Sequence, residues 1–232
     1  MSGVPFSPAR VWLIARNTVL EAARQKLFNF LLLIALAMVA GVQGFREFNF
    51  GAPELKFLTD FGFGAMAFFG SALTIVATAQ LFFSEIEQRT VHTLLAKPVW
   101  RAEFMLGKYL GVMAVAAAFC AVLAAVLAGL LWLRAGALVR EFPDAFAQGH
   151  PFDYGALAAA AWLQWAKFAV LAAFTLLVAS FSQTQLYTVV AGFFVLVICH
   201  LQYLAQEAYA RGGSIVMRGV AGAIGLMFPN FQ

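Results

Sequence analysis

Charged residues are scarce in this chain. Asp, Glu, Lys and Arg together make up 11% of its 232 residues, whereas hydrophobic residues reach 63%. Soluble domains carry about 25% charged residues. No soluble domain of this length could bury so much apolar surface, so we expect the excess to face lipid. The net charge is weakly positive, and the positive residues cluster in short loops, which indicates membrane topology rather than nucleic-acid binding.

Cysteine is nearly absent as well. Cys120 and Cys199 both lie inside apolar runs and form no C-x-x-C pattern, so neither a disulfide nor a metal site is indicated. We expect both to be small packing residues. His150, with Asp144 and Asp153 nearby, could imitate a metal site, but three scattered ligands in a proline-containing loop do not predict one.

Several motifs of catalysis and nucleotide binding are missing. The sequence contains no G-x-x-x-x-G-K-[ST], no H-E-x-x-H and no G-x-S-x-G. The chain therefore has no phosphate-binding loop of its own, and we predict neither an enzyme active site nor a bound cofactor. If it transports a substrate, the energy must come from a partner or an ion gradient.

Long apolar runs dominate what is present. We expect an all-α, polytopic membrane protein, because a span needs roughly 20 apolar residues and several segments reach that length. Residues 8–25 before them read as an amphipathic helix in the membrane interface, with Trp12, Ala15, Val19 and Ala22 on its apolar face. The predicted spans are residues 27–45, 61–83, 109–133, 156–181 and 186–205.

Lys and Arg predict the orientation of these spans. Four precede the first span, and four more lie between the second and third, whereas the opposite loops hold only Arg46 and Lys56, then Arg134 and Arg140. The bias places the N-terminus and residues 84–108 in the cytoplasm and residues 134–154 outside. The last two spans are joined by a short polar turn at 182–185 and should form a hairpin.

A charged segment, residues 84–96, separates the second span from the third. Ser84 and Glu87 have the spacing of a capping box, which predicts a helix start, and Lys97 before Pro98 predicts its end. A short capped helix between two spans suits the docking of a soluble partner. The alternative is a simple solvated loop helix.

Residues 84–111 contain the pattern E-x-E-x-R-T-x-x-T-L-L-A-K-P-V-x-R-x-E-F-x-x-G-K-Y-L-G. This pattern, after an N-terminal interfacial helix and two spans, resembles the permease subunit of export-type bacterial ABC transporters, in the branch of the nitrous-oxide-reductase maturation permeases. The resemblance covers essentially the whole chain. It implies an inner-membrane domain that pairs with a second permease, identical or not, and with separate ATPase subunits that bind the ATP. It also implies that 84–96 is the coupling helix, whose candidate contacts are Glu85, Glu87, Arg89 and His92.

The chain departs from this family at its end. Family members have a sixth span after an external re-entrant segment, and residues 214–232 are too short to supply both. We expect a re-entrant or interfacial segment there and further apolar residues in the native gene.

Polar residues inside the spans are candidates for a substrate path. A charge at the bilayer centre costs at least about 2.5–3.5 kcal/mol, so Lys167, one turn beyond Gln164, should face protein or water. His200 should lie at a similar depth in the next span. Ser71, Thr74 and Thr78 share one face of the second span. Structural hydrogen bonds, and for the lysine snorkelling to water, are the alternatives.

Small residues at i, i+4 spacing mark the third span: Ala117, Ala121, Ala125 and Gly129. Such a stripe permits close helix approach, either within one subunit or at a dimer seam.

The function best supported by the sequence is that of a permease subunit of an ABC exporter, with an unidentified substrate. The alternative is a non-transporting membrane scaffold that recruits a cytoplasmic ATPase for maturation or signalling.

Overall fold

The computed structural model describes residues 6–42, 44, 54–87, 100–141, 152–210 and 222. Within these residues the chain forms helices and no strand, which confirms the predicted all-α membrane protein. The helices are α1 (Pro8–Arg24), α2 (Lys26–Gly41), α3 (Glu54–Glu87), α5 (Arg101–Glu141), α6 (Tyr154–Phe181) and α7 (Gln185–Ala210).

Three of these helices are long and apolar enough to cross a membrane, namely those covering Glu54–Ser84, Ala102–Arg140 and Tyr154–Phe181. α1 and α2 meet that standard only as a pair, which is bent by 67°. The apolar part of α7, Gln185–Leu201, is shorter. The predicted fifth span, 186–205, lies within α7. Large apolar side chains such as Leu163, Leu186 and Phe194 are exposed along α6 and α7, as lipid-facing helices require.

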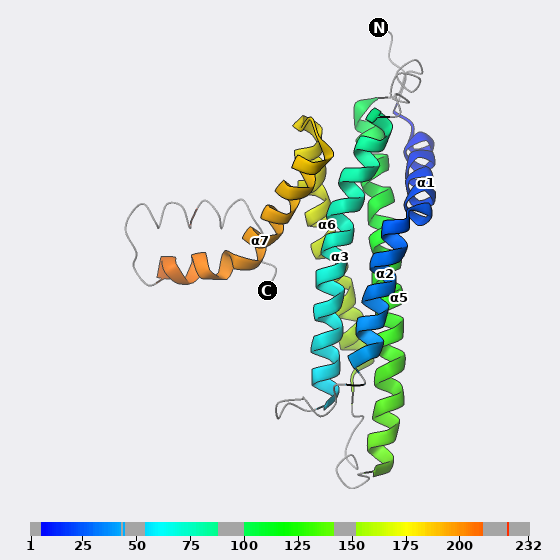
Figure 1. Ribbon diagram of the computed structural model, residues 1–232, viewed down its shortest axis with the longest axis vertical. Helices are drawn as coiled ribbons and strands as arrows, with labels where there is room; N and C mark the ends of the chain where they lie inside the picture. Colours follow the sequence, from blue (N-terminus) through cyan, green and yellow to red (C-terminus); the bar gives the residue numbers. More distant parts are fainter. Residues whose placement is uncertain are drawn as a thin grey trace.

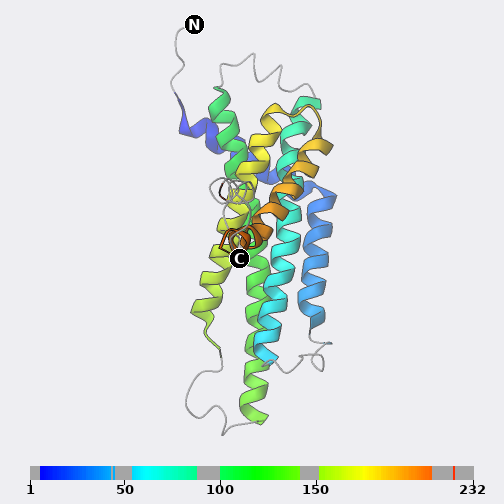
Figure 2. The same cartoon turned by 90° about the vertical axis from the view of Figure 1, so that its left-hand side faces the viewer.

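α3 and α5 form the centre of the bundle. α1 and α2 pack on one side of them and α6 and α7 on the other, as Figure 1 shows. Figure 2 shows α1 crossing the upper part of the bundle, where α3 ends and α5 begins. We call this part the Lys108 end and the opposite one, where α5 stops, the Arg134 end. The apolar core between them includes Leu73, Phe119, Leu123, Leu127 and Phe168.

α3 and α5 exceed the thickness of a bilayer. α5 has 41 residues. A helix of that length extends about 61 Å, roughly twice the apolar thickness of a membrane. The helix therefore projects from the lipid at one end or both. Near the Arg134 end, Arg134 of α5 forms an ion pair with Glu54 in the first turn of α3, and its Nε donates to Glu54 Oε1 at 2.8 Å.

The predicted helix start at Ser84 is wrong. α3 continues without a break through Ser84 to Glu87. The Ser84 hydroxyl does not cap a new helix, because it donates to Glu21 Oε1 of α1 at 2.8 Å. Residues 88–96 lie outside the described residues, and so does the predicted re-entrant tail, 214–232, apart from Gly222.

α6 and α7 pack against each other and are joined by only three residues, Ser182 to Thr184, which agrees with the predicted hairpin. The hydroxyls of Ser182 and Thr188 share a hydrogen bond across this turn. At the other end of α6, the Asp153 carboxylate caps the helix by accepting from the Gly155 N–H at 2.8 Å.

Candidate functional site

A buried carboxylate joins α1 to the start of α5 at the Lys108 end. The side chain of Glu103 is 0% exposed, and its Oε1 accepts from the Ser7 N–H at 2.7 Å. Its Oε2 accepts from the Trp100 N–H at 3.3 Å and lies 3.6 Å from Nη1 of Arg10. Glu103 thus caps α5 by reaching back to the backbone before it, and it also fixes the residue that precedes α1.

Two glycines of α5 let α1 approach closely. A Cβ on Gly107 would lie 2.7 Å from Cβ of Ile14, and one on Gly111 would lie 2.5 Å from Cβ of Thr18. Both distances are shorter than real Cβ contacts allow, so these positions need glycine. The buried face of α1 that packs here is Val11, Ala15, Thr18 and Ala22.

A second carboxylate joins three helices. Oε1 of Glu21 accepts from Ser84 of α3, and its Oε2 lies 3.7 Å from Nζ of Lys108 on α5. Lys108 is only 2% exposed, and its Nζ lies 5.9 Å from the ring centroid of Phe104, within the range of a cation–π interaction. The Lys108 end is therefore held by shielded polar contacts as well as by apolar packing.

These contacts explain part of the sequence pattern quoted above. Within the E-F-x-x-G-K-Y-L-G stretch, Glu103, Gly107, Lys108 and Gly111 all serve the contact between α1 and α5. Tyr109 faces the other way, and its hydroxyl donates to the Ala169 carbonyl of α6 at 3.2 Å. The sequence reasoning missed this role, although the G-x-x-x-G spacing of Gly107 and Gly111 is a signal for close helix packing.

The predicted ATPase contacts lie at or beyond the end of α3. Glu85 and Glu87 belong to its last turn, next to Ser84, and their side chains are outside the described part. Arg89 and His92 fall outside the described residues altogether. The described structure therefore places the start of the predicted coupling segment directly beside the Glu21 carboxylate.

The predicted path residues do not gather in one place. Ser71 of α3 and His200 of α7 line the same groove, about 390 Å³ in volume, together with the apolar residues Gly64, Ala67, Phe68, Leu196, Val197 and Leu201. His200 Nδ1 lies 3.1 Å from the Leu196 carbonyl of its own helix. Lys167 and Gln164 are half-buried on α6 and do not line this groove.

Thr74 and Thr78 are buried, and their hydroxyls bond within α3. Thr74 donates to the Gly70 carbonyl at 2.7 Å and Thr78 to the Thr74 carbonyl at 2.6 Å. These bonds favour the structural alternative for the two threonines.

The small-residue stripe of α5 is largely uncovered. Ala121, Ala125 and Gly129 are exposed, and nothing lies within 4 Å of a Cβ built on Gly129. Among the described residues, the stripe is therefore not used for close packing within one subunit at these positions. Cys120, on the same helix, is buried, as is Cys199.

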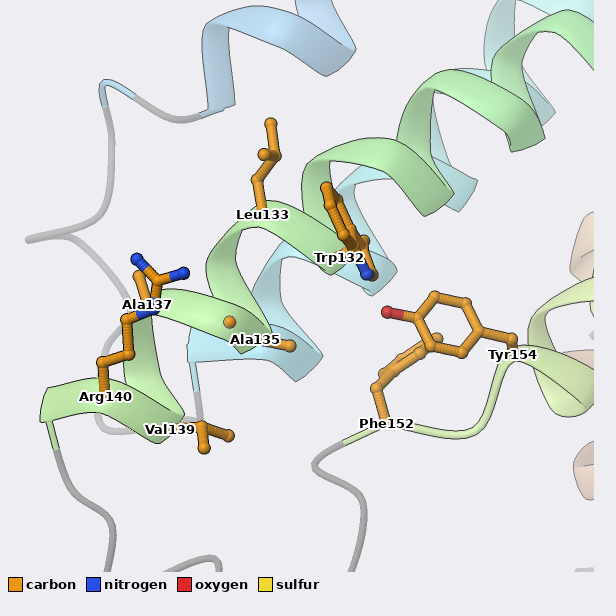
Figure 3. A pocket seen from close by; sticks show the side chains of 9 residues that line it. Trp132, Leu133, Ala135, Ala137, Val139, Arg140, Phe152 and Tyr154 are labelled. Carbon is orange, nitrogen blue, oxygen red and sulfur yellow. The ribbon is translucent and has the colours of Figure 1, made fainter.

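A larger cavity, of about 590 Å³, lies at the Arg134 end between α5 and the start of α6. Figure 3 shows the Tyr154 hydroxyl pointing toward Trp132, with Phe152 beneath and Arg140 at the far side. Aromatic and basic side chains of this kind typify the membrane–water interface. Asp153, one of the three residues considered for a metal site, caps α6, while Asp144 and His150 fall outside the described residues.

Comparison with known proteins gives one match. No curated protein and no solved structure matches the chain. The family model described as ABC-2 family transporter protein matches residues 12–210, which run from within α1 to the end of α7 and include Glu21, Ser84, Glu103 and Lys108. The chain belongs to the ABC-2 family of transporter proteins.

Proposed function

We propose that this chain is the permease subunit of a bacterial ABC exporter, which moves a substrate across the inner membrane and depends on a separate ATPase. The family match over residues 12–210 carries this proposal. It is supported by the lack of a phosphate-binding loop in the sequence, since a transporter of this family without one needs an ATPase partner. Our narrower assignment, to the branch of the nitrous-oxide-reductase maturation permeases, rests on the pattern in residues 84–111.

In this proposal the Lys108 end faces the cytoplasm, in keeping with the distribution of Lys and Arg. Residues 84–96 then form the contact with the ATPase, through Glu85, Glu87, Arg89 and His92. A second permease, identical or not, completes the transporter. The groove that Ser71 and His200 line between α3 and α7 is the proposed part of the substrate path, because its otherwise apolar lining includes these two polar residues. A role of Lys167 and Gln164 in the substrate path remains a prediction.

Reversal of one charge in the coupling segment tests the proposal. The tagged permease is expressed with the ATPase encoded beside it, and copurification and ATP hydrolysis in proteoliposomes are measured for the wild type and for Arg89→Glu. We expect Arg89→Glu to reduce both copurification and stimulated hydrolysis and to leave membrane insertion unchanged. Arg140→Glu makes the same charge change at the Arg134 end and should behave as wild type.

Normal copurification and normal stimulation in Arg89→Glu would argue against docking through this segment. An ATPase that binds the permease but is never stimulated by any substrate would favour the scaffold alternative.

A further inference from the structure

Glu21 is placed to link the end of α3 to α5. One oxygen of its carboxylate accepts from the Ser84 hydroxyl at 2.8 Å, and the other lies 3.7 Å from the Lys108 ammonium. Ser84 belongs to the last turn of α3, which ends at Glu87. The Glu21 side chain of α1 therefore contacts α3 at Ser84, the first residue of the segment proposed to dock the ATPase.

α1 itself is fixed on α5. The Gly107 and Gly111 contacts leave no room for α1 to move closer, and Glu103 binds the Ser7 N–H and Arg10 at the start of α1. Glu21, in the last turns of α1, is thus carried by a helix whose position is set by α5. Through its hydrogen bond with Ser84, the Glu21 carboxylate connects α3 to α1 and α5.

Lys108 attracts one oxygen of the Glu21 carboxylate, 3.7 Å away. The lysine is 2% exposed and Glu21 is 29% exposed, so water screens their attraction less than it screens a pair on the surface. Removal of Glu21 would leave a buried cation without this partner, and such losses are strongly destabilising. Loss of the Ser84 hydroxyl, in contrast, would remove its hydrogen bond to Glu21 and leave the Glu21–Lys108 pair in place.

We propose that Glu21 and Lys108 are positioning residues for ATPase coupling: through Ser84 they hold the end of α3, and with it the docking segment, in the orientation that the ATPase binds. This inference rests on the proposed function and adds to it the residues that orient the contact. Neither residue needs to touch the ATPase.

Substitution of Ser84 is the sharpest test, because it removes the hydrogen bond between α1 and α3 and leaves the Glu21–Lys108 pair in place. Ser84→Ala should weaken ATPase binding to the permease in detergent roughly 10-fold, as loss of one hydrogen bond to a charged group predicts. Its melting temperature should fall only slightly, because α3 keeps its packing against α2, α5, α6 and α7. Ser84→Thr keeps the hydroxyl and should restore binding. Ser180→Ala is the matched control, since that hydroxyl donates to the Leu177 carbonyl of its own helix at 2.7 Å.

A charge exchange tests the pair behind Ser84. Glu21→Lys and Lys108→Glu should each reduce ATPase binding by more than 10-fold. The double variant, which restores an ion pair between α1 and α5, should recover a large part of that loss. The single charge changes should also lower the melting temperature, so the deciding variant is Ser84→Ala: a purely structural role would predict that its loss of binding is matched by an equal loss of stability.

The outcomes separate this inference from the proposed function. If the wild type binds the ATPase, Arg89→Glu does not, and Ser84→Ala binds normally, the positioning role is overturned and the proposed function stands. Equal losses in Ser84→Ala and Ser180→Ala, or a loss that matches a lower melting temperature, also overturn it. A wild-type permease that binds no ATPase would refute both proposals.

Discussion

Gly111 presents only a hydrogen atom to α1. A Cβ there would also lie 2.6 Å from Cγ2 of Thr18 and 3.0 Å from the backbone carbonyl of Ala15. Thr18 has little freedom to move away, because it is β-branched and its hydroxyl donates to the Ile14 carbonyl at 2.9 Å. The fit between α1 and α5 therefore depends on the absence of a Cβ at Gly111, as it does at Gly107.

Gly111→Ala should accordingly destabilise the permease. We expect a loss of about 1–3 kcal/mol, the usual cost of overpacking a tight contact. The matched control is Gly129→Ala on the same helix, where nothing lies within 4 Å of the added Cβ. That variant should be neutral or gain up to about 1 kcal/mol, since alanine favours helix. Unfolding of the purified protein in detergent measures both, and equal effects would contradict the contact between α1 and α5.

The sequence predicted some of these residues and missed others. Trp12, Ala15, Val19 and Ala22 were expected to share the apolar face of the first helix. In the structure Ala15 and Ala22 are buried against the bundle, while Trp12 is 70% exposed. A helical pattern predicts which side chains form the apolar face. It does not predict which of them contact protein and which contact lipid, because both environments favour apolar groups.

The end of α3 shows how a distant contact can override a local sequence signal. The capping-box spacing of Ser84 and Glu87 is a genuine signal for a helix start. It failed because the serine hydroxyl bonds to Glu21, 63 residues away in the sequence. Such a distant partner is invisible to a local pattern, whereas the all-helical fold followed from composition and run length alone.

α6 offers a case in which the cap can be tested. Asp153 is exposed, and its carboxylate accepts from the Gly155 N–H, so its contribution is largely confined to the helix start. Asp153→Ala should cost about 1 kcal/mol, while Asp153→Asn should cost little, because asparagine is an equally good cap. Hydrogen exchange at the Gly155 amide measures the cap: exchange should be faster in Asp153→Ala and unchanged in Asp153→Asn. Identical exchange in the two variants would assign the cap no role.

The whole molecule is a long bundle with two chemically different ends. The Lys108 end has one buried and one partly buried carboxylate, each paired with a basic group, and the Arg134 end has an ion pair and an aromatic cavity. The family match and the positive-residue bias together led us to propose that the Lys108 end is cytoplasmic. Apart from the G-x-x-x-G spacing of Gly107 and Gly111, no local pattern predicted how tightly this end is packed, because its polar contacts join residues of three separate helices.

Labelling of single cysteines tests this orientation. Cys120 and Cys199 are buried and can be replaced by serine to leave a background without thiols. A membrane-impermeant maleimide added to intact cells should label Gln148→Cys and should not label Gln88→Cys until the membrane is opened. The reverse pattern would show that the bundle is inverted and would place the proposed docking segment outside the cell.

The contact between α1 and α5 also has a consequence for biosynthesis. Ser7 and Glu103 are separated by 96 residues. At the usual rate of translation, about 5–20 residues per second, that separation corresponds to a delay of roughly 5–20 s. During this interval the ribosome has delivered α1 but not the glycines on which it will rest. An amphipathic helix with exposed Trp12, Leu13 and Leu20 can wait on the bilayer surface until α5 arrives. The lipid surface would then cover the apolar face of the first helix until α5 replaces it.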